Sequence, residues 1–78
     1  MPHVSVKMLK GRSDSQKEQI AQACKKAVMD TLGIGDTYIT VSVEDYTSRE
    51  WQDVFKSEVS EKGDKVLVKA KYDPKSLL

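Results

Sequence analysis

Pro2, directly after the first methionine, is the residue of this sequence with the clearest potential for chemistry. Aminopeptidases remove an initiator methionine when a small residue follows it, and this cleavage would leave Pro2 with a free secondary amine. Such an amine is a base and a nucleophile at the end of the chain. Proline also suits the first residue of a strand, because it lacks a backbone N–H and fixes its own φ. Pro2 therefore has two interpretations, a strand start and a reactive group.

The residues after Pro2 predict the strand that would position it. Over His3–Leu9, apolar and polar side chains alternate with the period of two that is typical of a strand. The alternating residues are Val4, Val6 and Met8 on one side and His3, Ser5 and Lys7 on the other. Lys10-Gly11-Arg12 then forms a turn.

Helical signals predict a long helix over about Asp14–Leu32. Ser13 and Gln16 have the spacing of a capping box, and Gly33 stands where a C-cap glycine belongs. Apolar residues recur between these ends at the helical spacing. They include Ile20, Cys24, Ala27, Val28 and Leu32.

A second strand is expected over Tyr38–Asp45, where Ile39, Val41 and Val43 alternate with polar residues. A strand, a helix and a strand imply a right-handed crossover between two parallel strands.

A second, shorter helix is expected after this strand. Thr47 and Glu50 form another capping box, and Trp51 lies in the helix that it opens. The segment 66–73 reads as a short strand or as an irregular packed segment, and Pro74 is expected to end regular structure.

Length and composition limit the class of protein. The 78 residues are expected to form a single domain over 1–78. A chain of this length is too small to bury a large hydrophobic core by itself. One cysteine excludes an internal disulfide, and one histidine and one cysteine without metal-ligand spacing predict neither a structural metal nor a cofactor. A net charge of +1 shows no bias towards nucleic acid, and no apolar run approaches a membrane span. A cytoplasmic protein is expected.

The predicted fold class is α+β: a β-α-β unit of two parallel strands with a long crossover helix, followed by a second short helix and a C-terminal tail. Helices on one face would leave the other face and both edges of this sheet open to water, which is rare for parallel sheets. We expect a second copy of the chain to complete the fold. A functional site would then lie between subunits.

The sequence resembles the tautomerase family typified by 4-oxalocrotonate tautomerase. Pro2 opening the first strand and "GRSDSQKEQI" over Gly11–Ile20 carry the resemblance, which extends to about Val59. The tail is similar to that of a longer-tailed subgroup described as dimeric, so a dimer is favoured over the hexamer of the shortest members. The resemblance implies that Met1 is removed and that the Pro2 amine is the catalytic base of a keto–enol tautomerase, an isomerase that acts on small 2-oxo acids.

Proline chemistry suits such a reaction. A tautomerase needs a group that is unprotonated near neutral pH and that becomes an acid once it holds the proton. A free α-amino group has an ordinary pKa of about 7.7–8.0, and the secondary amine of proline is more basic. Burial and a nearby cation both disfavour the ammonium form, so an apolar, cationic pocket would bring the Pro2 amine close to the working pH.

The resemblance implies three further site residues. Arg12 matches the arginine that binds a substrate carboxylate, a task that suits the guanidinium group. Trp51 matches the aromatic wall of the pocket. Thr40 stands where the typical member has a second arginine, which puts in doubt any substrate that needs two cations. Arg12 and Trp51 also have plain interpretations, as an exposed turn residue and a packing residue.

Two alternatives to a tautomerase stay open. Pro2 could serve the hydration or dehalogenation of short unsaturated acids, with Glu44, Asp45 or Glu50 activating water. The chain could also be a non-catalytic homo-oligomeric binding module.

Overall fold

The structure is a computed structural model that describes residues 1–78, and it divides into two compact units, Met1–Asp45 and Tyr46–Leu78. The expectation of one domain over the whole chain stays a prediction.

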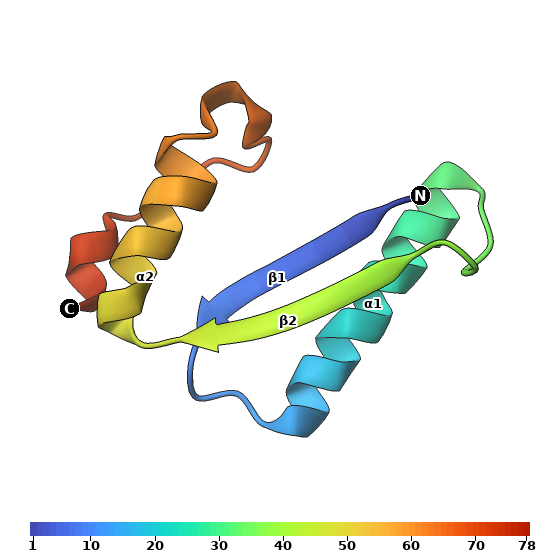
Figure 1. The fold of residues 1–78 in the computed structure, drawn as a ribbon, viewed down its shortest axis with the longest axis horizontal. Helices are drawn as coiled ribbons and strands as arrows, with labels where there is room; N and C mark the ends of the chain where they lie inside the picture. Colours follow the sequence, from blue (N-terminus) through green and yellow to red (C-terminus); the bar gives the residue numbers. More distant parts are fainter. The chain divides into compact units, whose positions relative to one another are not determined.

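The first unit has the predicted β-α-β order of β1 (His3–Leu9), α1 (Asp14–Leu32) and β2 (Thr40–Tyr46). β1 and β2 are neighbours in a two-stranded sheet. They run in the same direction, with α1 along one face, as Figure 1 shows. The predicted bounds of β1 and α1 are confirmed. β2 begins two residues later than expected, because Thr37 and Tyr38 lie in a turn.

Hydrogen bonds at both ends of α1 explain where this helix begins and ends. The Gln16 backbone N–H donates to Ser13 Oγ over 3.1 Å, and the Ser13 backbone N–H donates to Gln16 Oε1 over 3.0 Å. Both bonds of the predicted capping box are therefore present. At the other end, Gly33 has a φ of 66° and donates its N–H to the Met29 carbonyl over 2.8 Å. This left-handed conformation favours glycine.

The two faces of the sheet differ in polarity. Lys17 of α1 contacts Asp45 of β2, so Asp45 lies on the face that α1 covers. Strand alternation places Val41 and Val43 on the same face. Except at the last residue of each strand, the opposite face carries polar residues, which are His3, Ser5 and Lys7 of β1 and Thr40, Ser42 and Glu44 of β2.

The core of the chain is small. Ile39, 9% exposed, is the one buried apolar residue. The apolar residues of β1, α1 and β2 that face one another are half-buried. A protein of this length buries a limited fraction of its surface on folding.

The second unit begins with α2 (Ser48–Phe55), which has the predicted capping box of Thr47 and Glu50. A π-helical turn over Lys56–Ser60 continues the helix. The segment 66–73 forms no strand. Of the two expectations for it, a short strand or an irregular packed segment, the irregular segment is correct.

The expectation that Pro74 ends regular structure is wrong. Pro74 begins a 3₁₀ turn over Pro74–Leu77, and the Asp73 carboxylate caps this turn by accepting from the Lys75 backbone N–H over 2.9 Å. Proline suits a first helical position, because the missing N–H would have no partner there.

Candidate active site

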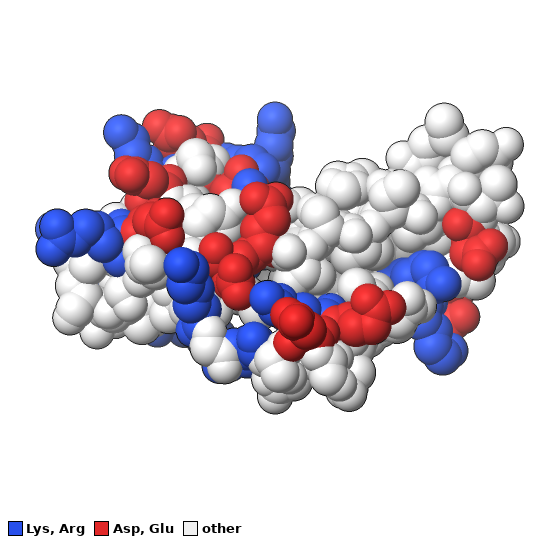
Figure 2. All heavy atoms as spheres, turned by 60° about the horizontal axis from the view of Figure 1, so that its bottom comes forward, with Lys and Arg blue, Asp and Glu red and all other residues white.

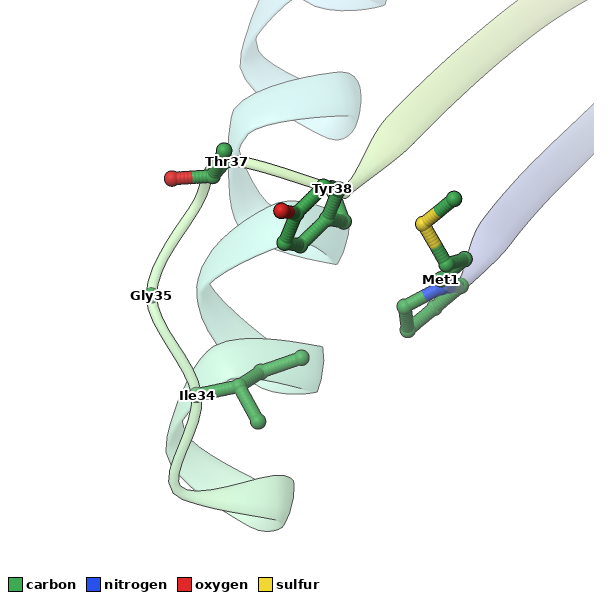
Figure 3. Close-up of a pocket in the computed structure, with 6 residues that line it drawn as sticks. Met1, Ile34, Gly35, Thr37 and Tyr38 are labelled. Carbon is green, nitrogen blue, oxygen red and sulfur yellow. The ribbon is translucent and has the colours of Figure 1, made fainter.

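Pro2 lies directly before β1 and is half-buried. Its carbonyl accepts a hydrogen bond from the Thr40 backbone N–H over 3.3 Å, which joins the beginnings of the two strands. A pocket of about 360 Å³ lies beside Pro2. The pocket is lined by Met1, Pro2, Ile34, Gly35, Thr37 and Tyr38. Figure 3 shows the Ile34 and Tyr38 side chains turned into this space and the Thr37 side chain turned away.

A second hollow, of about 380 Å³, lies between Pro2 and the last turns of α1. Its lining residues are Pro2, Ala27, Val28, Thr31 and Leu32. Neither lining contains a charged side chain. Figure 2 shows charges of both signs over much of the visible face, but a broad uncharged area at the right, the end at which Figure 1 places the N-terminus. Apolar surroundings disfavour the charged form of an amine.

Met1 determines the chemical state of Pro2. While the Met1–Pro2 peptide bond is intact, the Pro2 nitrogen is an amide and has no useful basicity. Met1 is 93% exposed, so no packing protects this bond from an aminopeptidase. Removal of Met1 would create a secondary amine at the edge of the uncharged pocket.

Arg12 lies at the opposite end of β1 from Pro2. It is exposed and follows Gly11, whose φ of 123° makes the turn out of the strand. The seven residues of β1, at a rise of about 3.3 Å each, separate the two ends by about 20 Å. The structure therefore does not bring Pro2 and Arg12 together within one copy of the chain.

Thr40 is the predicted site residue that the structure does bring to Pro2. It begins β2 and bonds Pro2 through its backbone. Its hydroxyl Oγ1 lies 2.6 Å from Nδ1 of His3. The sequence pattern gave His3 only a face of the strand and no partner, so this pair was missed. The period of two places a residue on a face but does not say which residue of the next strand lies opposite.

Trp51 belongs to the second unit, where it has well-defined neighbours. Its indole N–H donates to Tyr72 Oη over 2.9 Å, and its ring lies 6.5 Å from that of Tyr46. Tyr72 also packs edge-on against Phe55, at 5.5 Å between ring centroids. These contacts support the packing role of Trp51, and its role in substrate binding stays a prediction.

Lys17 and Asp45 form an ion pair in which both groups have a shifted pKa. Lys17 Nζ lies 3.0 Å from Asp45 Oδ2, and about a quarter of each side chain is exposed. The hydrogen bond from Lys17 holds the pKa of Asp45 below its ordinary value, and the same bond raises the pKa of Lys17.

Asp45 and Glu50, considered above for water activation, make structural hydrogen bonds. Asp45 is bound to Lys17, as described above. Glu50 accepts a hydrogen bond from the Thr47 backbone N–H over 2.8 Å and so completes the cap of α2.

No group of three or more histidine, cysteine, aspartate or glutamate residues is placed to hold a metal ion. No helix has the length and apolar character required to cross a membrane.

Comparison with known sequences gives a consistent result. A sequence profile described as "Tautomerase enzyme" matches residues 2–54. The chain is 33% identical over 73 residues to a probable tautomerase of Xylella fastidiosa, which covers 92% of this chain and 89% of that protein. It is 42% identical over 45 residues to a 2-hydroxymuconate tautomerase of Bacillus subtilis, which covers 58% of this chain and 73% of that protein.

Solved structures agree with the sequence matches. YwhB, a homologue of 4-oxalocrotonate tautomerase, superposes with a TM-score of 0.57 and 38% identity over 60% of this chain and 77% of its own. TomN, a homologue from the tomaymycin biosynthetic pathway, superposes with a TM-score of 0.61 and 30% identity over 64% of this chain and 77% of its own. The profile match covers more than half of the residues and begins at Pro2, and the chain therefore belongs to the tautomerase family.

Proposed function

We propose that this protein is a keto–enol tautomerase of small 2-oxo acids and that the Pro2 amine, freed by removal of Met1, is its catalytic group. The observation that carries the proposal is the position of Pro2. It lies at the chain end, beside an uncharged pocket, at the first residue of the family match.

The reaction requires one proton to move between oxygen and carbon. The Pro2 amine takes the proton of the enol hydroxyl at C2 of the substrate. The electrons of the O–H bond form the C2=O carbonyl, and the π electrons of the C2=C3 bond move onto C3. The resulting ammonium delivers the proton to C3, which becomes a saturated carbon, and the amine is regenerated. A group that serves as base and then as acid works best when its pKa is near the working pH. The uncharged surroundings of Pro2 favour such a pKa, because they disfavour the ammonium.

Arg12 of a second copy would supply the cation for the substrate carboxylate. Within one copy, the length of β1 separates Pro2 from Arg12. In a symmetric dimer whose twofold axis is perpendicular to β1, the β1 strands of the two copies would run antiparallel, and the beginning of one could lie near the end of the other. We propose a homodimer with two shared sites, each combining Pro2 of one subunit with Arg12 of the other.

Thr40 in place of a second family arginine favours substrates with one carboxylate. A hydroxyl donates a hydrogen bond but brings no charge, and Trp51 would add a flat apolar wall. Enols that carry one carboxylate and an aryl or short apolar group, such as phenylenolpyruvate, are the proposed substrates. Dicarboxylates such as 2-hydroxymuconate should be turned over less well.

The test compares four protein preparations in a tautomerase rate assay with phenylenolpyruvate. Untagged wild-type protein, shown by intact mass to lack Met1, should be active. Pro2→Ala should lose most of the activity, because a primary amine on a flexible residue replaces the rigid ring. A form with an N-terminal tag should be inactive and folded, since its Pro2 nitrogen is an amide. A C-terminal tag is the matched control and should keep wild-type rates.

Two results of this experiment would contradict the proposal. Full activity of the N-terminally tagged form would mean that the amine is not the catalytic group. An untagged wild type that lacks Met1 and has no activity on enols would favour a hydratase, to be checked with halo-acrylates, or a binding module.

A further inference from the structure

Met1 marks the place in which a substrate of Pro2 would have to bind. The Met1 carbonyl carbon is bonded to the Pro2 nitrogen, and both residues line the pocket of about 360 Å³ beside β1. The other two carbon substituents of this nitrogen belong to the rigid proline ring. After Met1 is removed, the proton and the lone pair of the amine therefore point to the side that Met1 leaves. A substrate that exchanges a proton with Pro2 would occupy the place of Met1 in this pocket.

The wall of this pocket comes from the loop between α1 and β2. Ile34 and Tyr38 turn their side chains into the pocket (Figure 3), and they are 39% and 65% exposed. No charged side chain lines the pocket, and its volume lies at the lower end of the range of about 300–1,000 Å³ that is usual for small-molecule sites. This wall therefore suits an uncharged, apolar group of a substrate.

Backbone hydrogen bonds next to Tyr38 hold this residue beside Pro2. The Ile39 N–H donates to the Asp36 carbonyl over 3.3 Å and closes the turn that contains Tyr38. Ile39 itself is the buried apolar residue of the chain. The Thr40 N–H donates to the Pro2 carbonyl, also over 3.3 Å. Attachment of the loop to the core and to the first strand therefore sets the place of the Tyr38 ring.

We propose that Tyr38 is a specificity-determining residue of this site: its ring packs against the aryl group of an enol substrate whose reacting atoms lie at Pro2. The inference rests on the proposed function and names the residue that gives the aryl preference. Aromatic rings in contact gain more than the burial of their area alone. Tyr38 and Pro2 belong to the same unit, Met1–Asp45, so this contact requires neither the second unit nor a second copy.

The kinetic test uses the ratio of kcat/KM for phenylenolpyruvate to kcat/KM for 2-hydroxy-2,4-pentadienoate, an enol with one carboxylate and a short vinyl group in place of the aryl ring. Effects on the base or on the carboxylate-binding cation concern both substrates and cancel in the ratio. Tyr38→Ala should lower the ratio about tenfold, the size expected for loss of an aromatic contact and its buried area. Tyr38→Phe keeps the ring, and its ratio should stay within about twofold of wild type.

Thr37→Ala is the matched control from the same loop, because the Thr37 side chain is turned away from the pocket. Its ratio should stay at the wild-type value. An unchanged ratio in Tyr38→Ala, or an equal fall in Tyr38→Phe or Thr37→Ala, would overturn the proposal.

A binding experiment on wild-type protein that lacks Met1 separates this inference from the proposed function. Tyr38 is one of three tyrosines, and its ring signals in the NMR spectrum of a tyrosine-labelled sample are those that disappear in Tyr38→Phe. Cinnamate, an unreactive aryl monocarboxylate, should give nuclear Overhauser cross-peaks between its phenyl protons and these signals. Binding without such cross-peaks, or no binding at millimolar concentration, would overturn the role of Tyr38 even if the protein is a tautomerase. The cross-peaks would support that role even if no enol is turned over.

The form with an N-terminal tag tests the place of the ligand. The residue before Pro2 stays in the pocket in this form, so cinnamate should bind at least about tenfold more weakly than to the C-terminally tagged control. Equal dissociation constants for the two forms would mean that the aryl group lies elsewhere, and would overturn the proposal.

Discussion

At the scale of single residues, the position of a group matters as much as its type. The Pro2 nitrogen is an unreactive amide or a strong base depending on whether Met1 is present. Arg12 is one of the exposed cations of the chain, and in the proposed dimer a second copy would bring it to Pro2. Thr40 and His3 are polar residues that become hydrogen-bonded partners because the two strands begin side by side.

Substitutions at Arg12 and Thr40 should distinguish the two places in the proposed site at which substrate carboxylates would bind. Arg12→Ala should lower kcat/KM for phenylenolpyruvate and for 2-hydroxymuconate alike, by about 10- to 150-fold, because a charge-assisted hydrogen bond contributes about 1.5–3 kcal/mol. Thr40→Arg should raise kcat/KM for the dicarboxylate and change the monocarboxylate rate little. Steady-state kinetics on both substrates measure these effects. If Arg12→Ala lowered kcat/KM for the dicarboxylate alone, Arg12 would bind the second carboxylate of that substrate and not the carboxylate that both substrates share.

The sequence alone was sufficient to identify Pro2 and Thr40 as residues of interest, but not their neighbours. Pro2 is marked by its place after Met1, and Thr40 by the family pattern. The partner of His3 depends on the register between β1 and β2, which a period of two does not specify. The pocket depends on Ile34 and Tyr38, which lie in a turn without periodicity.

At the scale of elements, the helices carry strong local signals. Ser13 and Thr47 each satisfy backbone N–H groups that have no partner inside the helix. These signals depend on residues three positions apart, so a short window of sequence is enough to read them. The bounds of α1 were predictable for this reason.

The capping bond of α1 gives a measurable contribution to stability. Ser13→Ala should lower the free energy of unfolding by about 1 kcal/mol, because the Gln16 N–H loses its acceptor. Ser15→Ala is the matched control, because Ser15 accepts one 3.3 Å side-chain bond from Gln19 on the exposed surface. That variant should stay within about 0.5 kcal/mol of wild type. Urea unfolding measures the free energy of unfolding of both variants. If both substitutions lowered it equally, the capping bond of Ser13 would make no specific contribution to stability.

The ion pair between α1 and β2 should make stability depend on pH at both extremes. The pKa of Asp45 is lowered in the folded state, so its contribution is present above the unfolded value and is lost as the pH falls through the folded one. The pKa of Lys17 is raised, so its contribution is complete below the unfolded value of 10.5 and is lost as the pH rises further.

Asp45→Asn should therefore melt at a lower temperature than wild type near pH 7, and the two curves should converge in strong acid and in strong base. Asp36→Asn is the control, because Asp36 is 66% exposed and lies 3.9 Å from Lys25. Its effect should be smaller. Thermal melts by circular dichroism between pH 2 and 11 provide the comparison, and a constant difference over that range would exclude an ionic origin.

The tail was harder to predict than the helices, for a physical reason. Segment 66–73 has the β-branched and apolar residues of a strand but no partner strand, and a strand is defined by its pairing. Its conformation is set by contacts distant in sequence, such as the bond that the Trp51 indole N–H donates to Tyr72 Oη over 2.9 Å. Local propensity cannot specify contacts of this kind.

At the scale of the whole molecule, assembly is the main prediction. The small core and the two open sheet edges favour association of copies. Because Pro2 and Arg12 lie at opposite ends of β1 in one copy, the proposed dimer would also complete the proposed site.

A mixing experiment tests the shared site directly. Pro2→Ala and Arg12→Ala homodimers should each be nearly inactive. After joint refolding at equal concentrations, half of the dimers should combine one chain of each kind, and one of their two sites should be intact, which restores about a quarter of wild-type activity. Light scattering should show a dimer at micromolar concentration. Two inactive variants that remain inactive when mixed would mean that each site is made by one chain.

The bare apolar segment of the tail has a consequence for solubility. Leu67 and Val68 are 88% and 89% exposed, in a stretch with β-forming composition. Such a stretch is a template for aggregation when nothing interrupts it. Lys65, Lys69 and Lys71 bracket it with positive charge, so two copies that approach through this stretch repel each other. These lysines act as gatekeepers, and acetylation or neutral substitution in this part of the chain would lower the concentration at which the protein stays dispersed.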